Sequence, residues 1–379
     1  MKKSILVLGS FDNNNAESAA ELWAVLQKLS MYSLDLHFII PSLNPQFIST
    51  YFLDFDCEAP QVYINPRRGH MYFFGPATLS VLDRTAVVLT VGDFISMDRA
   101  VDRETIFSLG LILLLRAAAW KHIPVFGYGL RITLPTHWLE KRVIRHILAC
   151  HSMVFAGWHD IIPALKEWAL PCQINPGVNA AIDLSLLPIS DIEDLLTMHM
   201  VDVTRPFVAL IVTPSDKNEA YLLDILMYLS QCLSVNPVLI CTSVEAKQVA
   251  LHLTERLNHW IPMIYYPLLS HREITGILSK ADLIITTNLQ SCMLAASSGT
   301  PMLSLSEHPS ATATMQALGL EKYALKLTDI SPAVMLSCIG EAWELRAQLK
   351  GILHEHIRQL LALAEIQNNA FFTLLEKQR

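Results

Sequence analysis

Charged residues are scarce in this sequence, and cations are the rarer kind. Charged side chains make up 17% of the 379 residues, with 28 Lys and Arg against 35 Asp and Glu, which gives a formal net charge of -7. A chain without an overall cationic field is a poor partner for nucleic acid, so we expect none among its ligands. The apolar share of 52% predicts a large core and leaves a homo-oligomer open.

Cysteine is also sparse and shows no pairing pattern. The seven cysteines are an odd number, they are scattered along the chain, and no two are spaced as Cys-x-x-Cys. A disulfide framework or a zinc site would need regular, paired spacing. We therefore predict reduced thiols, no metal site and a cytoplasmic protein.

Long hydrophobic runs are missing as well. The most apolar stretch, residues 106–120, is shorter than the roughly 20 residues that span a bilayer, and it contains Arg116. It predicts a buried helix and leaves peripheral contact with a membrane surface open. The apolar run near the start, residues 4–10, is too short for a signal peptide and predicts a first strand.

Short apolar runs alternate with longer helical patterns along most of the chain. The alternation covers residues 4–170 and restarts over residues 207–306 after a proline-rich stretch. This β-α-β order predicts parallel sheets covered by helices on both sides. We expect an α/β protein of the GT-B-like kind, with two Rossmann-like parallel-sheet lobes facing across a cleft and a long C-terminal helix region. The expected parts are an N-terminal lobe on the acceptor side (1–185), a linker (186–205), a C-terminal lobe on the donor side (206–330) and C-terminal helices (331–379).

Loops that follow the predicted strands should carry the function, because ligands of open α/β sheets bind at the carboxyl ends of the strands. In the first loop, Gly9 permits a tight turn and Asn14 can cap the next helix near a bound anion. In the loop after residues 86–91, Gly92 would let a ligand approach the backbone. Asp93 beside it could bind a sugar hydroxyl or act as a base.

Two further loops of the first lobe carry candidates. "FGYGLRITLPTH" places Arg131 after two glycines, where an exposed cation could grip a phosphate. "GWHDIIP" places His159 where a strand becomes a helix, and a histidine can serve as acid or base near neutral pH. An ordinary surface arginine and a hydrogen-bonding histidine explain the same residues without a ligand.

The second lobe supplies the donor-binding candidates. Lys217 follows its first strand and could contact a phosphate. The turn in "TTNLQSCM" carries Asn288 and Gln290 but no cation, so these residues could bind a donor only through hydrogen bonds. Glu307 could grip a ribose, and His308 beside it could transfer a proton, although capping of the next helix also accounts for part of this loop.

The segments "ILVLGSFDNNNAESAAEL" and "LSKADLIITTNLQSCMLAASSGTPMLSLS" resemble the polysaccharide pyruvyl transferase family, and the resemblance extends over nearly the whole chain. It implies a GT-B-like fold and transfer of an enolpyruvyl-derived group from phosphoenolpyruvate to a sugar. The family's turn arginine falls on Asn288 and its general-acid histidine on Gln290. Another family arginine falls on Trp158, and a lysine falls on Ser310. Burying the charge of phosphoenolpyruvate without such cations costs on the order of several kcal/mol.

Three functions follow as hypotheses. The first is a pyruvyl transferase-like enzyme of surface glycan biosynthesis with an altered site, which uses phosphoenolpyruvate or a nucleotide sugar as donor and a glycan or sugar as acceptor. Its proton transfer would fall to His159, His308 or Asp93. The second is a nucleotide-sugar-dependent GT-B glycosyltransferase. The third is a non-catalytic, degenerate member that acts as a binding or partner subunit.

Overall fold

The computed structural model divides the chain into two compact units. The first comprises Met1–Asn13, Glu21–Ala180 and Ala362–Arg379, and the second comprises Asn14–Ala20 and Ala181–Leu361. Side chains of residues 64–65, 70–71 and 101–108 are not described. The structure describes residues 2–9, 11, 16–33, 35–65, 70–71, 73–92, 101–135, 137–157, 159–213, 219–257, 259–308 and 310–378.

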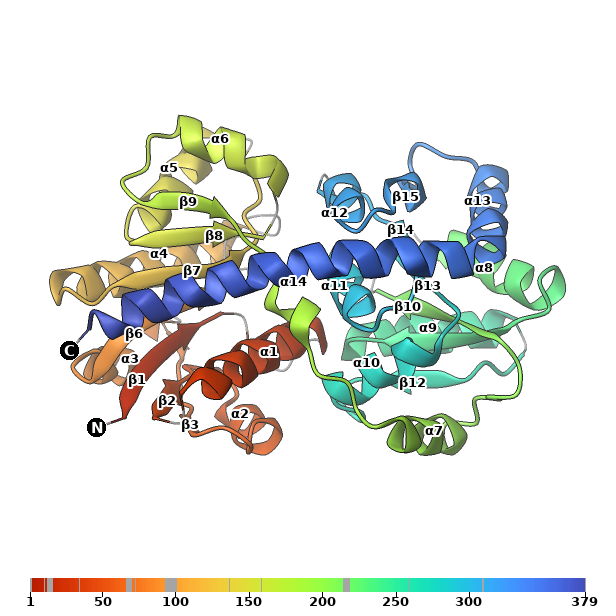
Figure 1. The fold of residues 1–379 in the computed structure, drawn as a ribbon, viewed down its shortest axis with the longest axis horizontal. Coiled ribbons are helices and arrows are strands. Elements are labelled where there is room, and N and C mark those ends of the chain that lie inside the picture. The colour runs from red at the N-terminus through yellow and green to blue at the C-terminus, as the bar shows by residue number, and fades with distance from the viewer. Residues whose placement is uncertain are drawn as a thin grey trace. The chain divides into compact units, whose positions relative to one another are not determined.

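The first unit is built around a parallel sheet of seven strands in the order β3-β2-β1-β6-β7-β8-β9 (Figure 1). A small antiparallel pair, β4 and β5, lies outside it. The elements of this part of the chain are β1 (Lys3–Leu8), α1 (Ala16–Tyr32), β2 (Leu36–Ile39), α2 (Pro45–Tyr51), β3 (Cys57–Glu58), β4 (Ile64–Asn65), β5 (His70–Met71), α3 (Pro76–Leu82), β6 (Thr85–Val91), α4 (Val101–Trp120), β7 (Val125–Leu130), α5 (Trp138–Leu148), β8 (Met153–Ala156), α6 (Ile162–Glu167) and β9 (Gln173–Pro176).

Burial on both faces explains why the sequences of the central strands are continuous apolar runs. Every residue of β7 is buried, and β1 is buried from Ile5 onward. Strands of a parallel sheet are covered on both faces, so they lack the alternation of a strand with one wet face. Helix α14 (Arg346–Glu376) returns to this unit, where Phe371 packs edge-to-face on Phe126 of β7. The end of the chain thus covers the sheet that its beginning started.

The second unit repeats the design with six parallel strands in the order β12-β11-β10-β13-β14-β15. Crossovers between parallel strands are right-handed, so α8 and α9 cover one face while α10, α11 and α12 cover the other. Its further elements are α7 (Ile189–Met198), β10 (Phe207–Val212), α8 (Glu219–Gln231), β11 (Asn236–Cys241), α9 (Val244–Leu257), β12 (Met263–Tyr265), α10 (His271–Lys280), β13 (Leu283–Thr286), α11 (Leu289–Ser297), β14 (Met302–Leu305), α12 (Ala311–Ala317), β15 (Ala324–Leu325) and α13 (Pro332–Glu344).

The α/β class, the two Rossmann-like parallel sheets and the long C-terminal helical region are confirmed. Two elements near the expected linker were not predicted from the sequence. The stretch "QINP" forms strand β9 at the edge of the first sheet, and residues 189–198 of the expected linker form helix α7. In the C-terminal region the helical stretch is divided at Leu345, between α13 and α14.

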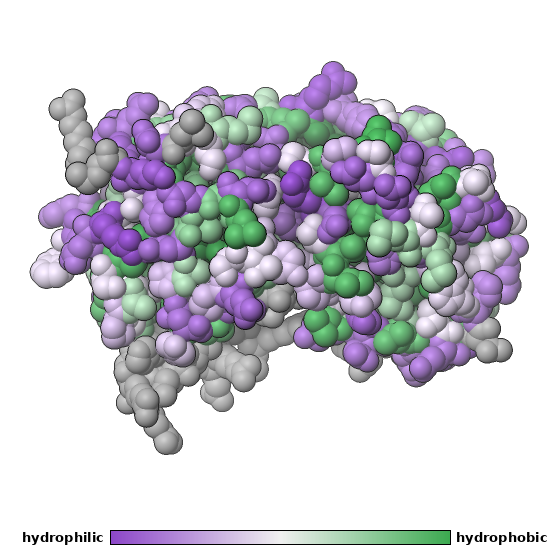
Figure 2. Space-filling model, turned by 90° about the horizontal axis from the view of Figure 1, so that it is seen from below, coloured by the Kyte–Doolittle hydropathy of each residue, from purple (hydrophilic) through white to green (hydrophobic). Residues whose placement is uncertain are grey.

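The outer surface mixes apolar and polar side chains. Figure 2 shows apolar (green) side chains scattered among hydrophilic (purple) ones on the face turned to the viewer. Across the described residues, no helix combines the length and apolar character needed to cross a bilayer.

Candidate functional site

The carboxyl edge of the second sheet carries neutral polar side chains. Thr213 follows β10, Thr242 follows β11, Thr287 follows β13 and Ser306 follows β14. These four strands are neighbours and parallel, so the residues after them gather at one edge of the sheet. Among the described residues that directly follow these strands, none is Lys or Arg. This edge can therefore hold a ligand through hydroxyl, amide and backbone groups.

The turn between β13 and α11 is fixed by its own hydrogen bonds. The Asn288 side chain accepts a hydrogen bond from the Gln290 backbone N–H at 3.0 Å and so caps the helix. The Thr286 hydroxyl accepts a bond from the Asn288 N–H at 3.1 Å. The hydroxyls of Thr287 and Thr213 lie 2.6 Å apart, which ties this turn to the neighbouring strand. Asn288 thus has a structural role at the position where the resemblance places the family's arginine.

The first turn of α11 also faces a buried carboxylate. The Ser291 hydroxyl donates a hydrogen bond to Glu17, which belongs to the first turn of α1 and to the same compact unit. Glu17 and Ser291 are both buried. Sequence reasoning missed this pair, because an acidic residue in the first turn of a helix is common and gives no sign of a partner 274 positions away.

Glu307 and His308 lie in the loop after β14. This strand is the neighbour of β13, which leads to Asn288. The Glu307 carboxylate accepts bonds from the backbone N–H and the hydroxyl of Thr328, each at 2.9 Å. His308 Nδ1 accepts a bond from the Ser310 backbone N–H at 3.1 Å. Both side chains therefore shape their loop, and Ser310 stands at the N-cap position of α12.

In the first unit, Arg131 is a buried residue and not the exposed cation that the sequence suggests. Its side chain is 4% exposed, and Nη1 lies 3.0 Å from both carboxylate oxygens of Glu21, which is 2% exposed. Gly92 has a φ of +77°, and a Cβ there would lie 2.4 Å from Glu21 Oε2. A side chain at position 92 would collide with Glu21, so packing alone accounts for Gly92 and no ligand is needed to explain it.

The remaining described candidates of the first unit have local partners as well. His159, in the short 3-10 turn η2 (His159–Ile161), has Nε2 2.6 Å from the Gly177 carbonyl oxygen. A Cβ on Gly9 would lie 2.3 Å from the Phe11 ring, so the glycine makes room for that ring. Asn14, Asp93 and Lys217 lie outside the described residues, as does Trp158.

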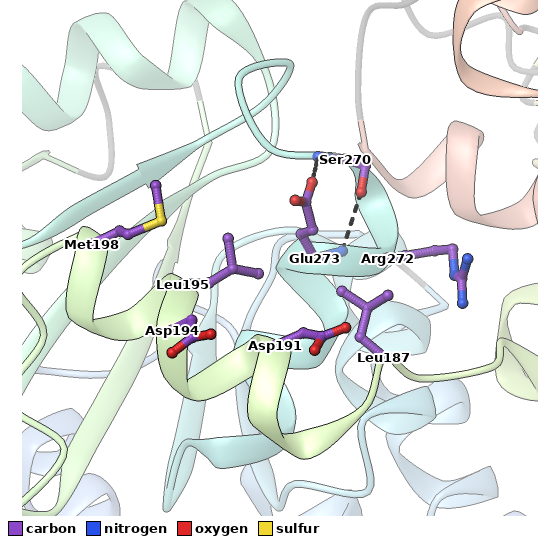
Figure 3. A pocket seen from close by; sticks show the side chains of 8 residues that line it. All are labelled: Leu187, Asp191, Asp194, Leu195, Met198, Ser270, Arg272 and Glu273. Atoms are coloured by element: carbon purple, nitrogen blue, oxygen red, sulfur yellow. Dashed lines mark hydrogen bonds between the residues drawn. The ribbon is translucent and has the colours of Figure 1, made fainter.

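The second unit has a hollow of about 470 Å³ between α7 and the start of α10 (Figure 3). Its lining includes three carboxylates, those of Asp191, Asp194 and Glu273, and the exposed Met198. Glu273 is committed to the capping box of α10, where it accepts a bond from the Ser270 N–H at 2.7 Å. The lining also contains one cation, Arg272, so the three carboxylates leave it with an excess of negative charge, which disfavours a phosphorylated donor. No group of three metal-ligating side chains occurs among the residues that the structure describes.

No protein family model and no curated protein sequence matches the chain. Solved structures do match it. UDP-GlcNAc 2-epimerase from Neisseria meningitidis, bound to UDP-GlcNAc, superposes with a TM-score of 0.63 at 16% identity over 98% of this chain and 100% of that one. HepE from Anabaena, in complex with UDP-glucose, gives 0.64 at 14% identity over 98% and 99%. A glycosyltransferase from Rickettsia africae gives 0.60 at 12% identity over 99% and 98%.

These likenesses define the class of fold. The chain has an α/β, GT-B-like fold with two parallel-sheet units along the full length of these enzymes. At such low identity the likeness concerns the fold alone. The expected fold is confirmed, whereas pyruvyl transfer remains a hypothesis from the sequence.

Proposed function

We propose that this protein is a GT-B-like enzyme of glycan metabolism that binds a nucleoside diphosphate sugar at the carboxyl edge of its second sheet. The observation that carries the proposal is the neutral hydroxyl and amide set that follows β10, β11, β13 and β14, with α11 beginning among these residues. Supporting it, structures with the same fold hold UDP-GlcNAc and UDP-glucose. The acceptor in this proposal is a sugar or glycan.

The chemistry of the edge suits a sugar nucleotide. The N-terminus of α11 attracts an anion through the helix dipole, which is equivalent to about half a positive charge, and through first-turn backbone N–H groups other than that of Gln290, which Asn288 already binds. The hydroxyls of Thr213 and Thr287 can donate to or accept from the many hydroxyls of a sugar. Because such bonds are neutral, they add specificity without requiring a paired cation.

Phosphoenolpyruvate fits the same edge less well. Both donors bring phosphate charge to this edge, but a nucleotide sugar also offers many neutral hydroxyls to the threonines. Nearly all polar atoms of phosphoenolpyruvate belong to its phosphate and carboxylate, and burying these charges without a cation is strongly unfavourable. The described residues that follow the four strands include His308 but no Lys or Arg, and Arg131 is already matched by Glu21. A pyruvyl transferase with an altered site therefore stands behind the sugar-nucleotide proposal.

A second candidate is a non-catalytic member that acts as a binding or partner subunit. It is favoured by one observation: each titratable candidate in the described part of the chain has a partner within the molecule. Arg131 binds Glu21, Glu307 binds Thr328, and the rings of His159 and His308 contact backbone groups. Groups held in this way are less free to act on a substrate, although they could still position one.

Calorimetric titration of the full-length chain tests the proposal. UDP, UDP-GlcNAc and UDP-glucose should bind, and phosphoenolpyruvate should bind far more weakly. Incubation with each sugar nucleotide, followed by NMR for free UDP or an epimerised sugar, then separates an enzyme from a binding subunit. If phosphoenolpyruvate alone bound, the pyruvyl transferase hypothesis would replace the sugar-nucleotide proposal. If no sugar nucleotide bound, the proposal would be wrong.

A further inference from the structure

Two neighbouring helices of the first unit expose an apolar stripe beside arginines. On α4, Leu109, Leu113, Arg116 and Trp120 are exposed. Their spacings of four, three and four residues place them along one face of the helix. The opposite face is buried and contributes Leu111, Leu114, Leu115 and Ala118 to the core. The exposed stripe runs for about 16 Å at 1.5 Å per residue.

Helix α5 continues this surface. At its start, Trp138 is 64% exposed and Leu139 is 50% exposed, and further along Arg142 and Arg145 are exposed. The helix buries Ile144, Ile147 and Leu148 on its other side. It is therefore amphipathic, with an outer face that combines aromatic, aliphatic and cationic side chains.

The two exposed stripes belong to one surface. Helices α4 and α5 contact each other and cover the same side of the first sheet (Figure 1). Burial raises the pKa of the Cys150 thiol, just beyond the end of α5, and the Arg116 guanidinium of α4 opposes that rise because it lies nearby. We call this surface the α4–α5 face and define it by Leu109, Leu113, Arg116, Trp120, Trp138, Leu139, Arg142 and Arg145.

The arginines of this face are exposed, so they can meet an external anion. Within the described part of the chain, Arg116, Arg142 and Arg145 form no ion pair, whereas nearby Lys121 is held by Asp83. The whole chain carries a net charge of -7, so a local group of exposed arginines departs from the average surface. A cationic surface on an acidic protein selects for an anionic partner.

We propose that the α4–α5 face docks the protein on an anionic lipid bilayer. Tryptophan rings favour the boundary between headgroups and acyl chains, where one side is apolar and the other is wet. Trp120, which is 81% exposed, and Trp138 lie on the two helices of the face, with leucines beside them. Arginines can extend from the same face to the lipid phosphates while their stems lie along apolar surface. A nucleic acid or an acidic protein would use the cations but gain less from the exposed leucines.

The proposal is independent of the sugar-nucleotide site, because its test measures vesicle binding and needs no activity. The full-length chain is sedimented with vesicles of phosphatidylcholine alone and of phosphatidylcholine mixed with phosphatidylglycerol. Binding is expected only to the mixed vesicles, and it should weaken as salt rises. At about 1 kcal/mol per arginine near the surface, Arg142→Glu with Arg145→Glu should weaken binding about 30-fold or more.

A second variant tests the apolar contribution, since Trp120→Ser with Trp138→Ser should reduce binding about tenfold. The matched controls are Lys326→Glu with Lys350→Glu, which makes the same change in charge at exposed sites of the second unit, and Met31→Ser with Leu53→Ser. Both controls should bind as the native chain does, and circular dichroism should show all variants folded. Absence of vesicle binding, or equal losses in the control and test pairs, would overturn the proposal, as would binding of an acidic protein or DNA without vesicle binding.

Discussion

The carboxyl edges of the two sheets differ in the charge of the side chains that line them. In the first unit, Arg131 and Glu21 bring opposite charges into the interior, where each satisfies the other. In the second unit, the residues that follow the strands are neutral, for example Thr213 and Thr287. The buried carboxylate of Glu17 lies beside α11 and accepts a hydrogen bond from Ser291. The same α/β plan thus supports an edge closed by its own ion pair and an edge whose neutral groups suit a sugar nucleotide.

The largest expected effect comes from breaking the ion pair of the first unit. Arg131→Met leaves the Glu21 carboxylate buried without its partner, and we expect a loss of about 3–5 kcal/mol in the free energy of unfolding. Chemical denaturation of the full chain measures this loss. Combining Arg131→Met with Glu21→Gln should recover much of it, because the double variant leaves no charge behind. A loss below about 1 kcal/mol for the single variant would mean that the pair is not buried as described.

The pH dependence of stability should report a buried histidine in each unit. Burial lowers the pKa of His151 in the first unit to about 4 and that of His271 in the second to about 3. Between the ordinary pKa of 6.5 and these values the unfolded chain binds more protons than the folded one, so stability falls as the pH drops through this window. For His151 the expected loss between pH 6.5 and pH 4 is about 3 kcal/mol.

Denaturation series at several pH values check this prediction. His151 is held by the Thr90 hydroxyl at 2.8 Å and the Ile147 carbonyl oxygen at 3.0 Å, so His151→Gln can keep part of the contact. This variant should be less stable than the native chain at neutral pH but should depend less on pH below 6.5. An unchanged slope would show that His151 is not neutral in the fold.

A smaller effect is expected for the buried carboxylate beside α11. Ser291→Ala removes a hydrogen bond to Glu17 and should cost about 2 kcal/mol of stability. Ser279→Ala is the control, since Ser279 donates to the Gly276 carbonyl oxygen of its own helix, and it should change stability by less than about 0.5 kcal/mol. If urea denaturation gave equal losses for the two substitutions, the hydrogen bond from Ser291 to Glu17 would not contribute more than an ordinary one.

The smallest effect concerns the cap of α11. Asn288→Ala removes the acceptor of the Gln290 N–H and should cost about 1 kcal/mol, whereas Asn288→Ser should cost much less. Thermal unfolding of both variants measures the difference. If both lost the same stability, the side-chain oxygen would not be acting as a cap.

The fold could be predicted from the sequence more fully than the site. Apolar runs such as β7 and β10 are buried on both faces, so their pattern already indicates parallel strands. Strand β9 was missed because its residues, "QINP", are polar or turn-forming and lie at a sheet edge.

The site depends on contacts between distant positions. Arg131 and Glu21 are 110 residues apart, so no local pattern could show that the arginine is buried and paired. Asn288 was placed in the turn between a strand and a helix, and its cap bond is equally compatible with a ligand site and with an ordinary helix start.

The central claim, that a sugar nucleotide binds beside the start of α11, is tested most directly by the UDP affinity of Asn288→Asp. Aspartate caps a helix as well as asparagine does, so the fold should be kept while a negative charge is added where the diphosphate would lie. The matched control is Asn44→Asp, at the N-cap of α2 in the first unit. By calorimetry, Asn288→Asp should weaken UDP binding by about tenfold or more relative to the native chain, and Asn44→Asp should leave it unchanged. Equal affinities of all three proteins for UDP, or no UDP binding by the native chain, would contradict the account.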